Sequence, residues 1–193
     1  MPIFNACGCE GNRPDNELRR KVIKIAIAGM AAPWVLTGGL AHADITQGDR
    51  LVEEDAEGTP VPLKVADLRV GKPMVVYPFD SKKAVVRNDS RLNKIVLLRL
   101  PESDLDPKTK ARAAGGVIAY SAICTHQACD VKTWLSKEKA LVCFCHSSKF
   151  LLLEDGVVTS GPALRSLPSI PLTLDGDQLV IAGAFSAPPG APA

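Results

Sequence analysis

The 193-residue sequence is poor in aromatic side chains, at 5%, contains only three histidines and carries a formal net charge of only +2. Five of its 23 Lys and Arg side chains and three of its 21 Asp and Glu side chains precede Asp44, so the rest of the chain carries 18 of each sign. A neutral domain without a basic run lacks the electrostatic footprint of nucleic-acid binding. We therefore expect no nucleic-acid partner.

The remaining composition favours one mainly β domain of about 150 residues behind a targeting segment. Fifteen glycines and fifteen prolines separate short runs rich in Val, Ile and Leu, which is typical of many short strands and tight turns. A segment at 101–116 breaks this rhythm, and its Asp106 is suited to cap a short helix. The predicted strands are 74–79, 84–86, 95–100, 117–121, 141–144, 150–153, 157–159, 172–174 and 179–182.

The first 43 residues have the pattern of an export signal or a membrane anchor. Arg19 and Arg20 precede an apolar stretch at 25–40, and Ala41-His42-Ala43 is an arrangement that a signal peptidase cuts. The paired arginines resemble a twin-arginine signal, which predicts export to the periplasm. The apolar stretch is short for a span of about 20 residues, so two fates stay open: cleavage after Ala43, or retention of residues 22–41 as an inner-membrane anchor.

Three further divisions follow the signal. The acidic, turn-rich segment 44–62 is predicted to be a linker, 63–183 the folded domain, and 184–193, which ends in Pro-Pro-Gly-Ala-Pro-Ala, a disordered tail. Cys7 and Cys9 lie ahead of the signal, and their pattern assigns them no role.

Two short motifs hold four cysteines and two histidines. Cys124-Thr125-His126-Gln127-Ala128-Cys129 is followed, after thirteen residues, by Cys143-Phe144-Cys145-His146-Ser147-Ser148. A tetrahedral zinc ion takes four N or S ligands, so it leaves two of the six over. An iron–sulfur centre with two Cys and two His ligands also leaves two cysteines. A zinc site, or a disulfide beside two incidental histidines, is the alternative.

The motifs C-x-H-x-x-C and C-x-C-H resemble those of the Rieske family in full and with its usual separation. The resemblance implies an antiparallel β-sandwich with a small cluster-binding subdomain, preceded here by the hydrophobic signal or anchor helix. It also implies one [2Fe-2S] cluster per chain, held by thiolates on one iron and imidazoles on the other. The implied ligands are Cys124, His126, Cys143 and His146, and the implied disulfide joins Cys129 to Cys145.

The family pattern extends to residues around the cluster. A Ser that donates to a bridging sulfide is present as Ser148, whereas the Tyr that donates to a ligand thiolate is replaced by Phe150. Because hydrogen bonds to sulfur stabilise the reduced cluster, we expect a reduction potential below that of quinol-oxidising members and above that of ring-hydroxylating ones. Gly161 and Pro162 resemble the proline-containing loop that covers the cluster.

Two functions fit the resemblance, and both make the chain an electron-transfer subunit rather than a stand-alone enzyme. The first is a periplasmic subunit like the small subunit of arsenite oxidase, whose partner is a catalytic oxidoreductase subunit. The second is the Rieske subunit of a quinol–cytochrome c reductase, with cytochrome b, cytochrome c and quinol as partners. The polar Gln127, where the second class has an apolar Leu, favours the first. A ring-hydroxylating dioxygenase is disfavoured because only His42 remains outside the motifs, too few histidines for its 2-His-1-carboxylate iron site.

Overall fold

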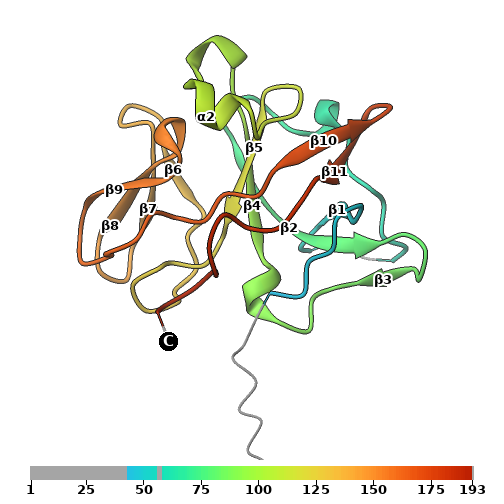
Figure 1. The fold of residues 1–193 in the computed structure, drawn as a ribbon, viewed down its shortest axis with the longest axis horizontal. Coiled ribbons are helices and arrows are strands. Elements are labelled where there is room, and N and C mark those ends of the chain that lie inside the picture. The colour runs from blue at the N-terminus through green and yellow to red at the C-terminus, as the bar shows by residue number, and fades with distance from the viewer. Residues whose placement is uncertain (1–42, 56–57, 193) are drawn as a thin grey trace, which may run out of the picture. The chain divides into compact units, whose positions relative to one another are not determined.

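Two antiparallel β-sheets make up most of the regular structure in the computed structural model, which describes residues 43–55 and 58–192 (Figure 1). The larger sheet has the strand order β10-β11-β1-β2-β4-β5, with β3 paired to β2. The second sheet has the order β6-β7-β8-β9. The predicted class, a mainly β antiparallel protein, is confirmed.

The strands of the larger sheet are short, largely apolar runs, and polar turns separate them along the chain. All four residues of Ile95–Leu98 in β4 are buried, because alternate side chains point to opposite faces of the sheet and pack in two core clusters, Val96 and Leu98 in one and Ile95 and Leu97 in the other. The bounds are β1 Arg50–Glu53, β2 Pro73–Asp80, β3 Val85–Val86, β4 Ile95–Arg99, β5 Val117–Ser121, β10 Leu172–Asp175 and β11 Gln178–Ile181.

The four-stranded sheet is one continuous meander of the chain, seen in orange and brown tones in Figure 1. It carries the second cysteine motif, so it corresponds to the predicted cluster-binding subdomain. A buried core connects it to the larger sheet, since Leu98 and Ile118 cluster with Leu141 and Phe150. Its strands are β6 Thr133–Leu135, β7 Ala140–Cys143, β8 Ser148–Leu151 and β9 Val157–Ser160.

The segment between β4 and β5 contains the predicted short helix. Asp106 caps α2 Pro107–Lys110, and its carboxylate accepts from the N–H groups of Lys108 and Thr109 at 2.7 and 3.2 Å. Four single-turn 3-10 helices complete the regular structure of the described residues: Val65–Asp67, Arg91–Asn93, Glu102–Asp104 and Leu152–Glu154.

Two of the predicted divisions are wrong. The linker predicted over 44–62 contains β1, which lies inside the larger sheet between β11 and β2. The tail predicted to be disordered over 184–193 is packed on the domain as far as Gly190, and Pro189 and Gly190 are buried. Both segments find tertiary partners that their polar or Pro-rich composition does not reveal. Strand β6 was also not predicted.

The predictions for the N-terminal segment, including the twin-arginine pair Arg19 and Arg20, Cys7 and Cys9, and the signal or anchor helix, lie outside the described residues. Within residues 43–55 and 58–192, no helix is both long and apolar enough to cross a membrane.

Candidate metal centre

The first cysteine motif forms a closed loop directly after β5. The N–H of Cys124 donates to the carbonyl of Cys129 at 2.8 Å, and the N–H of Ala128 donates to the carbonyl of Cys124 at 3.0 Å. Ala128 has a positive φ of 56°, which turns the chain back toward its start. The loop therefore brings Cys124 and Cys129 to its base and leaves Gln127 exposed at its end.

The second motif is the turn of the β7–β8 hairpin. Cys143 ends β7 and pairs with Ser148, the first residue of β8. The four residues between them form the turn, and Ser147 has a φ of 58°. The strands hold Cys143 and Ser148 inside the protein, whereas the turn exposes Phe144, Cys145, His146 and Ser147.

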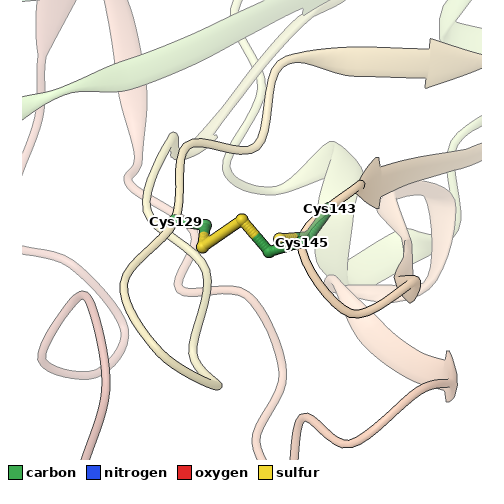
Figure 2. A group of neighbouring side chains, drawn as sticks. All are labelled: Cys129, Cys143 and Cys145. Carbon is green, nitrogen blue, oxygen red and sulfur yellow. A yellow bond between two sulfur atoms is a disulfide. The ribbon is translucent and has the colours of Figure 1, made fainter.

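A disulfide between Cys129 and Cys145 links the two loops, as the resemblance implies (Figure 2). Cys143 lies beside it, with the sulfur atoms of these three cysteines within 4.8 Å of one another. This trio is not itself a metal site, because sulfur atoms in a disulfide are not thiolate ligands. The disulfide instead fixes the distance between the two loops.

Two cysteines remain free among the described residues, Cys124 and Cys143, and each is only 1% exposed. Burial raises the pKa of the Cys124 thiol, and the neighbouring Cys143 thiol raises it further. The backbone N–H groups of His126 and Gln127 point at this sulfur and oppose the increase. Such N–H groups are suited to stabilise a thiolate when a cation replaces the proton.

The two histidines of the motifs face each other from opposite loops. Their Nδ1 atoms lie 3.2 Å apart, and the ring centroids are 4.7 Å apart with the ring planes at 90°. At this distance two ring nitrogens can form a hydrogen bond or bind the same metal ion. His146 is exposed and His126 is half-buried, so the imidazoles lie on the solvent side and the free thiols lie inside.

A third loop, at 161–165, closes against both motifs. The Oγ atom of Ser148, which is fully buried, accepts from the N–H of Ala163 at 3.2 Å. Gly161 has a φ of 87°, and a Cβ atom there would lie 2.6 Å from the Ser148 nitrogen. Only glycine permits this approach. The loop containing Gly161 and Pro162 therefore lies directly against the second motif.

The position that departs from the family, Phe150, is in β8 and is fully buried in the core cluster that contains Cys124 and Cys143. Its side chain has no hydroxyl with which to reach a sulfur atom. By contrast Phe144 and Leu164 are 74% and 91% exposed, although both are large and apolar. Phe144 lies between Cys143 and Cys145. Leu164 lies between Ala163, which contacts the second motif, and Arg165, which contacts the first.

Sequence reasoning missed the charged residues that hold the first loop. Arg91 donates to the Ala128 carbonyl at 3.1 Å and to Asp130 at 2.6 Å. Lys94 pairs with Asp130 at 3.1 Å and with Glu54 at 2.6 Å. No local pattern signals these contacts, because the partners lie 36 to 40 positions apart in the sequence.

The mainly β fold and the two linked Cys-His loops define an iron–sulfur electron-transfer class of protein. The chain belongs to the Rieske [2Fe-2S] domain family, whose family model matches residues 59–171.

Curated relatives are named as subunits of respiratory complexes. The Rieske iron-sulfur subunit of the cytochrome bc1 complex of Corynebacterium diphtheriae is 36% identical over 51% of this chain, and the match spans 26% of that protein. The corresponding subunit from Streptomyces coelicolor is 29% identical over 89% of this chain and 53% of its own length. A putative respiratory nitrate reductase subunit Rieske from Haloferax mediterranei is 28% identical over 86% of this chain and 73% of its own length. The chain therefore spans about a quarter of the corynebacterial relative.

Solved structures with similarity are also Rieske proteins or ferredoxins. The soluble domain of Rieske protein II from Sulfolobus acidocaldarius has a TM-score of 0.41 at 24% identity, and covers 50% of this chain and 64% of that one. The plasma membrane Rieske protein PetC3 from Synechocystis has a TM-score of 0.42 at 22% identity, and covers 62% of this chain and 95% of that one.

The cofactor of the family domain is a [2Fe-2S] cluster, and the residues present fit it. The donor set outside the disulfide is two buried thiols and two imidazoles whose Nδ1 atoms converge. This is the two-cysteine, two-histidine set of a Rieske centre. Two cysteines and two histidines would also satisfy a tetrahedral zinc ion, and it is the match to the Rieske [2Fe-2S] family model that favours the cluster.

Proposed function

We propose that the chain is the Rieske electron-transfer subunit of a membrane respiratory complex of the cytochrome bc1 type. In this proposal Cys124, Cys143, His126 and His146 hold the cluster. The observation that carries it is the arrangement of two buried thiols and two outward imidazoles on loops joined by the Cys129–Cys145 disulfide. The bc1 subunits among the relatives support the assignment to this type of complex.

The buried and the exposed sides of the site have different roles in this proposal. The cluster supplies one-electron oxidation and reduction. As ligands, Cys124 and Cys143 would hold negative charge away from water, and the N–H groups of His126 and Gln127, which point at the Cys124 sulfur, would compensate its share. His146, on the exposed side, presents its ring to a partner or to a substrate that donates a hydrogen bond.

The apolar side chains next to the site suit docking on a partner. Phe144 and Leu164 are exposed, yet each is next to residues of the cluster-binding loops. Exposed aromatic and aliphatic side chains of this size are typical anchors of protein interfaces. We propose that they contact the partner subunit while His146 faces its electron donor or acceptor.

A second candidate is the Rieske subunit of a different respiratory oxidoreductase, such as an enzyme of the nitrate reductase or arsenite oxidase type. Gln127 is exposed at the end of the first loop, where it gives that loop a polar surface. One relative is named as a respiratory nitrate reductase subunit. In this alternative the partner is a catalytic oxidoreductase subunit and no quinol contacts the histidines.

We also propose that the twin-arginine segment exports the folded domain to the periplasmic side of the inner membrane. A disulfide between Cys129 and Cys145 persists in an oxidising compartment, which supports export. Replacing Arg19 and Arg20 by Lys is expected to leave the protein in the cytoplasmic fraction. Retention of the full precursor mass in carbonate-washed membranes indicates an anchor, and a shorter form in the periplasmic fraction indicates cleavage.

The cluster assignment is tested by electron paramagnetic resonance of the reduced protein. Wild-type protein is expected to show one rhombic Rieske-type signal, and Cys124→Ala and His146→Ala are expected to lose it. Gln127→Ala is the matched control, because Gln127 is in the same loop but exposed and is not a proposed ligand. A ligand variant that keeps the signal contradicts the assignment.

The type of complex is tested by purifying an affinity-tagged chain from detergent-solubilised membranes. Cytochrome b in the purified complex supports the bc1 type, and a molybdopterin-containing subunit supports the second candidate. Quinol–cytochrome c reductase activity that disappears when the gene is deleted and returns with the wild-type chain would establish the first.

A further inference from the structure

The end of the chain lies across the domain beside the first cysteine motif. We call residues 186–190, Ser-Ala-Pro-Pro-Gly, the C-terminal strap. Its first residue is fixed by two hydrogen bonds: the Ser186 N–H donates to the Ser169 carbonyl at 2.8 Å, and the Ser169 N–H donates to the Ser186 Oγ at 3.0 Å. Ser169 is itself buried, so the strap begins at a well-anchored point.

The other end of the strap is held by one side chain. Arg165 donates from Nη1 to the carbonyl of Pro188 at 3.3 Å and from Nη2 to the carbonyl of Gly190 at 2.8 Å. Its Nε is buried and has no partner among the described residues. Because Arg165 is half-buried, loss of these carbonyls would leave a partly desolvated guanidinium with fewer hydrogen bonds.

The same arginine contacts the centre of the first motif. The hydroxyl of Thr125, which is only 1% exposed, donates to the Arg165 carbonyl at 2.7 Å. Thr125 is the residue between the proposed ligands Cys124 and His126. Arg165 therefore contacts the strap through its side chain and the ligand-bearing loop through its backbone carbonyl.

The last residue of the strap lies close to both flanks of this motif. Gly190 is buried with a φ of 84°, and a Cβ placed on it would lie 3.1 Å from Leu92, 3.7 Å from Ile123 and 3.9 Å from Ala128. Ile123 directly precedes Cys124, and Ala128 directly precedes Cys129. Pro188 and Pro189 have restricted φ angles, which lowers the entropy lost when the strap is ordered.

We propose that the C-terminal strap and Arg165 act as one unit that holds the first cluster-binding loop in its metal-binding geometry, with Arg165 as a positioning residue. Metal centres require their ligands to be held by surrounding contacts, because small displacements of a ligand weaken binding. The strap is linked to Thr125 through Arg165 and lies close to Ile123 and Ala128. This inference rests on the ligands proposed above.

The test compares four full-length or truncated proteins purified with the cluster bound. They are wild type, Arg165→Gln, a chain ending at Phe185, and the combination of the last two changes. We expect hydrogen–deuterium exchange of the peptide 123–130 and loss of iron to a chelator to be about tenfold faster in both single variants, because each loses the charge-assisted hydrogen bonds to the strap. Both are expected to shift the g-values of the reduced protein in the same way.

The combined variant tests whether the two parts act as a unit. If they do, the combination changes exchange and iron loss no more than either single change. Fully additive effects, or wild-type exchange and an unchanged spectrum in the truncated chain, would overturn the proposal. Arg69→Gln, at an exposed arginine elsewhere on the domain, is the matched control and is expected to match wild type.

Two further measurements keep the test decisive. If the truncated chain fails to fold, Gly190→Ala replaces it, because the added Cβ and the positive φ displace only the end of the strap. Wild-type exchange in that variant overturns the proposal. If the ligand assignment fails instead, Cys124→Ala keeps its rhombic signal, whereas the exchange of peptide 123–130 still reports on the strap.

Discussion

The buried Oγ of Ser148 accepts a hydrogen bond from the backbone N–H of Ala163 at 3.2 Å. This contact joins the second cysteine motif to the loop that contains Gly161 and Pro162. An oxygen that accepts from the loop still has its own proton to donate, as the resemblance to the Rieske family implies for this serine. Ser148 thus has two separable roles, one in loop stability and one in tuning the cluster.

Replacing Ser148 by Ala is expected to lower the free energy of unfolding by about 1 kcal/mol, because the Ala163 N–H loses its buried acceptor. Thermal unfolding followed by circular dichroism measures this as a decrease of about 3 °C in Tm. The reduction potential is expected to fall in the same variant. Ser166→Ala, at an exposed position nearby, is the control, and an unchanged potential in Ser148→Ala would remove the tuning role.

Replacing Phe150 by Tyr is expected to raise the reduction potential by about 40 mV. This value corresponds to one net hydrogen bond of about 1 kcal/mol in a one-electron couple, donated to a sulfur atom and stabilising the reduced state. A redox titration followed by electron paramagnetic resonance measures the change. The same substitution at Phe79, buried in β2 of the other sheet, is expected to leave the potential unchanged, and a Phe150→Tyr potential no higher than wild type contradicts the expectation.

Replacing Cys129 and Cys145 by Ser is expected to lower the free energy of unfolding by about 3 kcal/mol, because their 16-residue separation closes a loop in the unfolded chain. Urea unfolding of oxidised protein, of protein reduced by dithiothreitol and of the double variant measures the effect. The reduced wild type and the double variant are expected to agree. Equal stability of all three forms would show that the bridge does not stabilise the domain.

Acid is expected to weaken the contact between Asp130 and the 3-10 helix at Arg91–Asn93. Although partial burial opposes it, hydrogen bonds from Arg91 and Lys94 hold the pKa of Asp130 below its ordinary value of 3.8. A carboxyl with a lowered folded pKa contributes stability that is complete above its unfolded pKa and is lost as the pH falls through the folded value. Its contribution is therefore constant at neutral pH and declines below about pH 4.

Asp130→Asn tests this dependence. At pH 7 the variant is expected to be less stable than wild type by about 1 kcal/mol, since the pair is only partly buried. The difference is expected to shrink as the pH falls from 4 to 2, in urea unfolding at each pH. Asp55→Asn, at an exposed position, is the control. A difference that stays constant down to pH 2 would assign the effect to packing rather than to charge.

Replacing Phe144 and Leu164 by Ser is expected to reduce electron transfer to the partner by about tenfold, because exposed apolar anchors carry much of the free energy of an interface. The electron paramagnetic resonance signal of the reduced protein and the Tm are expected to stay at wild-type values, since both side chains project into solvent. Val61→Ser, which changes an apolar side chain that is 72% exposed elsewhere on the domain, is the control. Full activity of the double variant in isolated membranes would place docking elsewhere.

Much of the fold could be predicted because short strands leave local patterns. Each predicted strand, such as 95–100, overlaps a strand of the structure, because buried strands consist of contiguous Val, Ile and Leu between turn residues. Strand β1 escaped prediction because Arg50 and Glu53 flank only two apolar residues and an acidic segment follows. Its place inside the sheet depends on pairing with β2 and β11, which are distant in the sequence.

The residue types and spacing of the two motifs determined by themselves the family, the cofactor and the candidate ligands. These features are local, because the spacing of the candidate ligands along each six-residue motif can be read from the sequence alone. Only the tertiary structure decided how the loops are held: by Arg91 and Lys94 on Asp130, and by Arg165 beneath the C-terminal strap. A segment rich in Ala, Pro and Gly buries little apolar surface alone, so it becomes ordered only because the folded domain offers it hydrogen-bond donors and a surface to pack against.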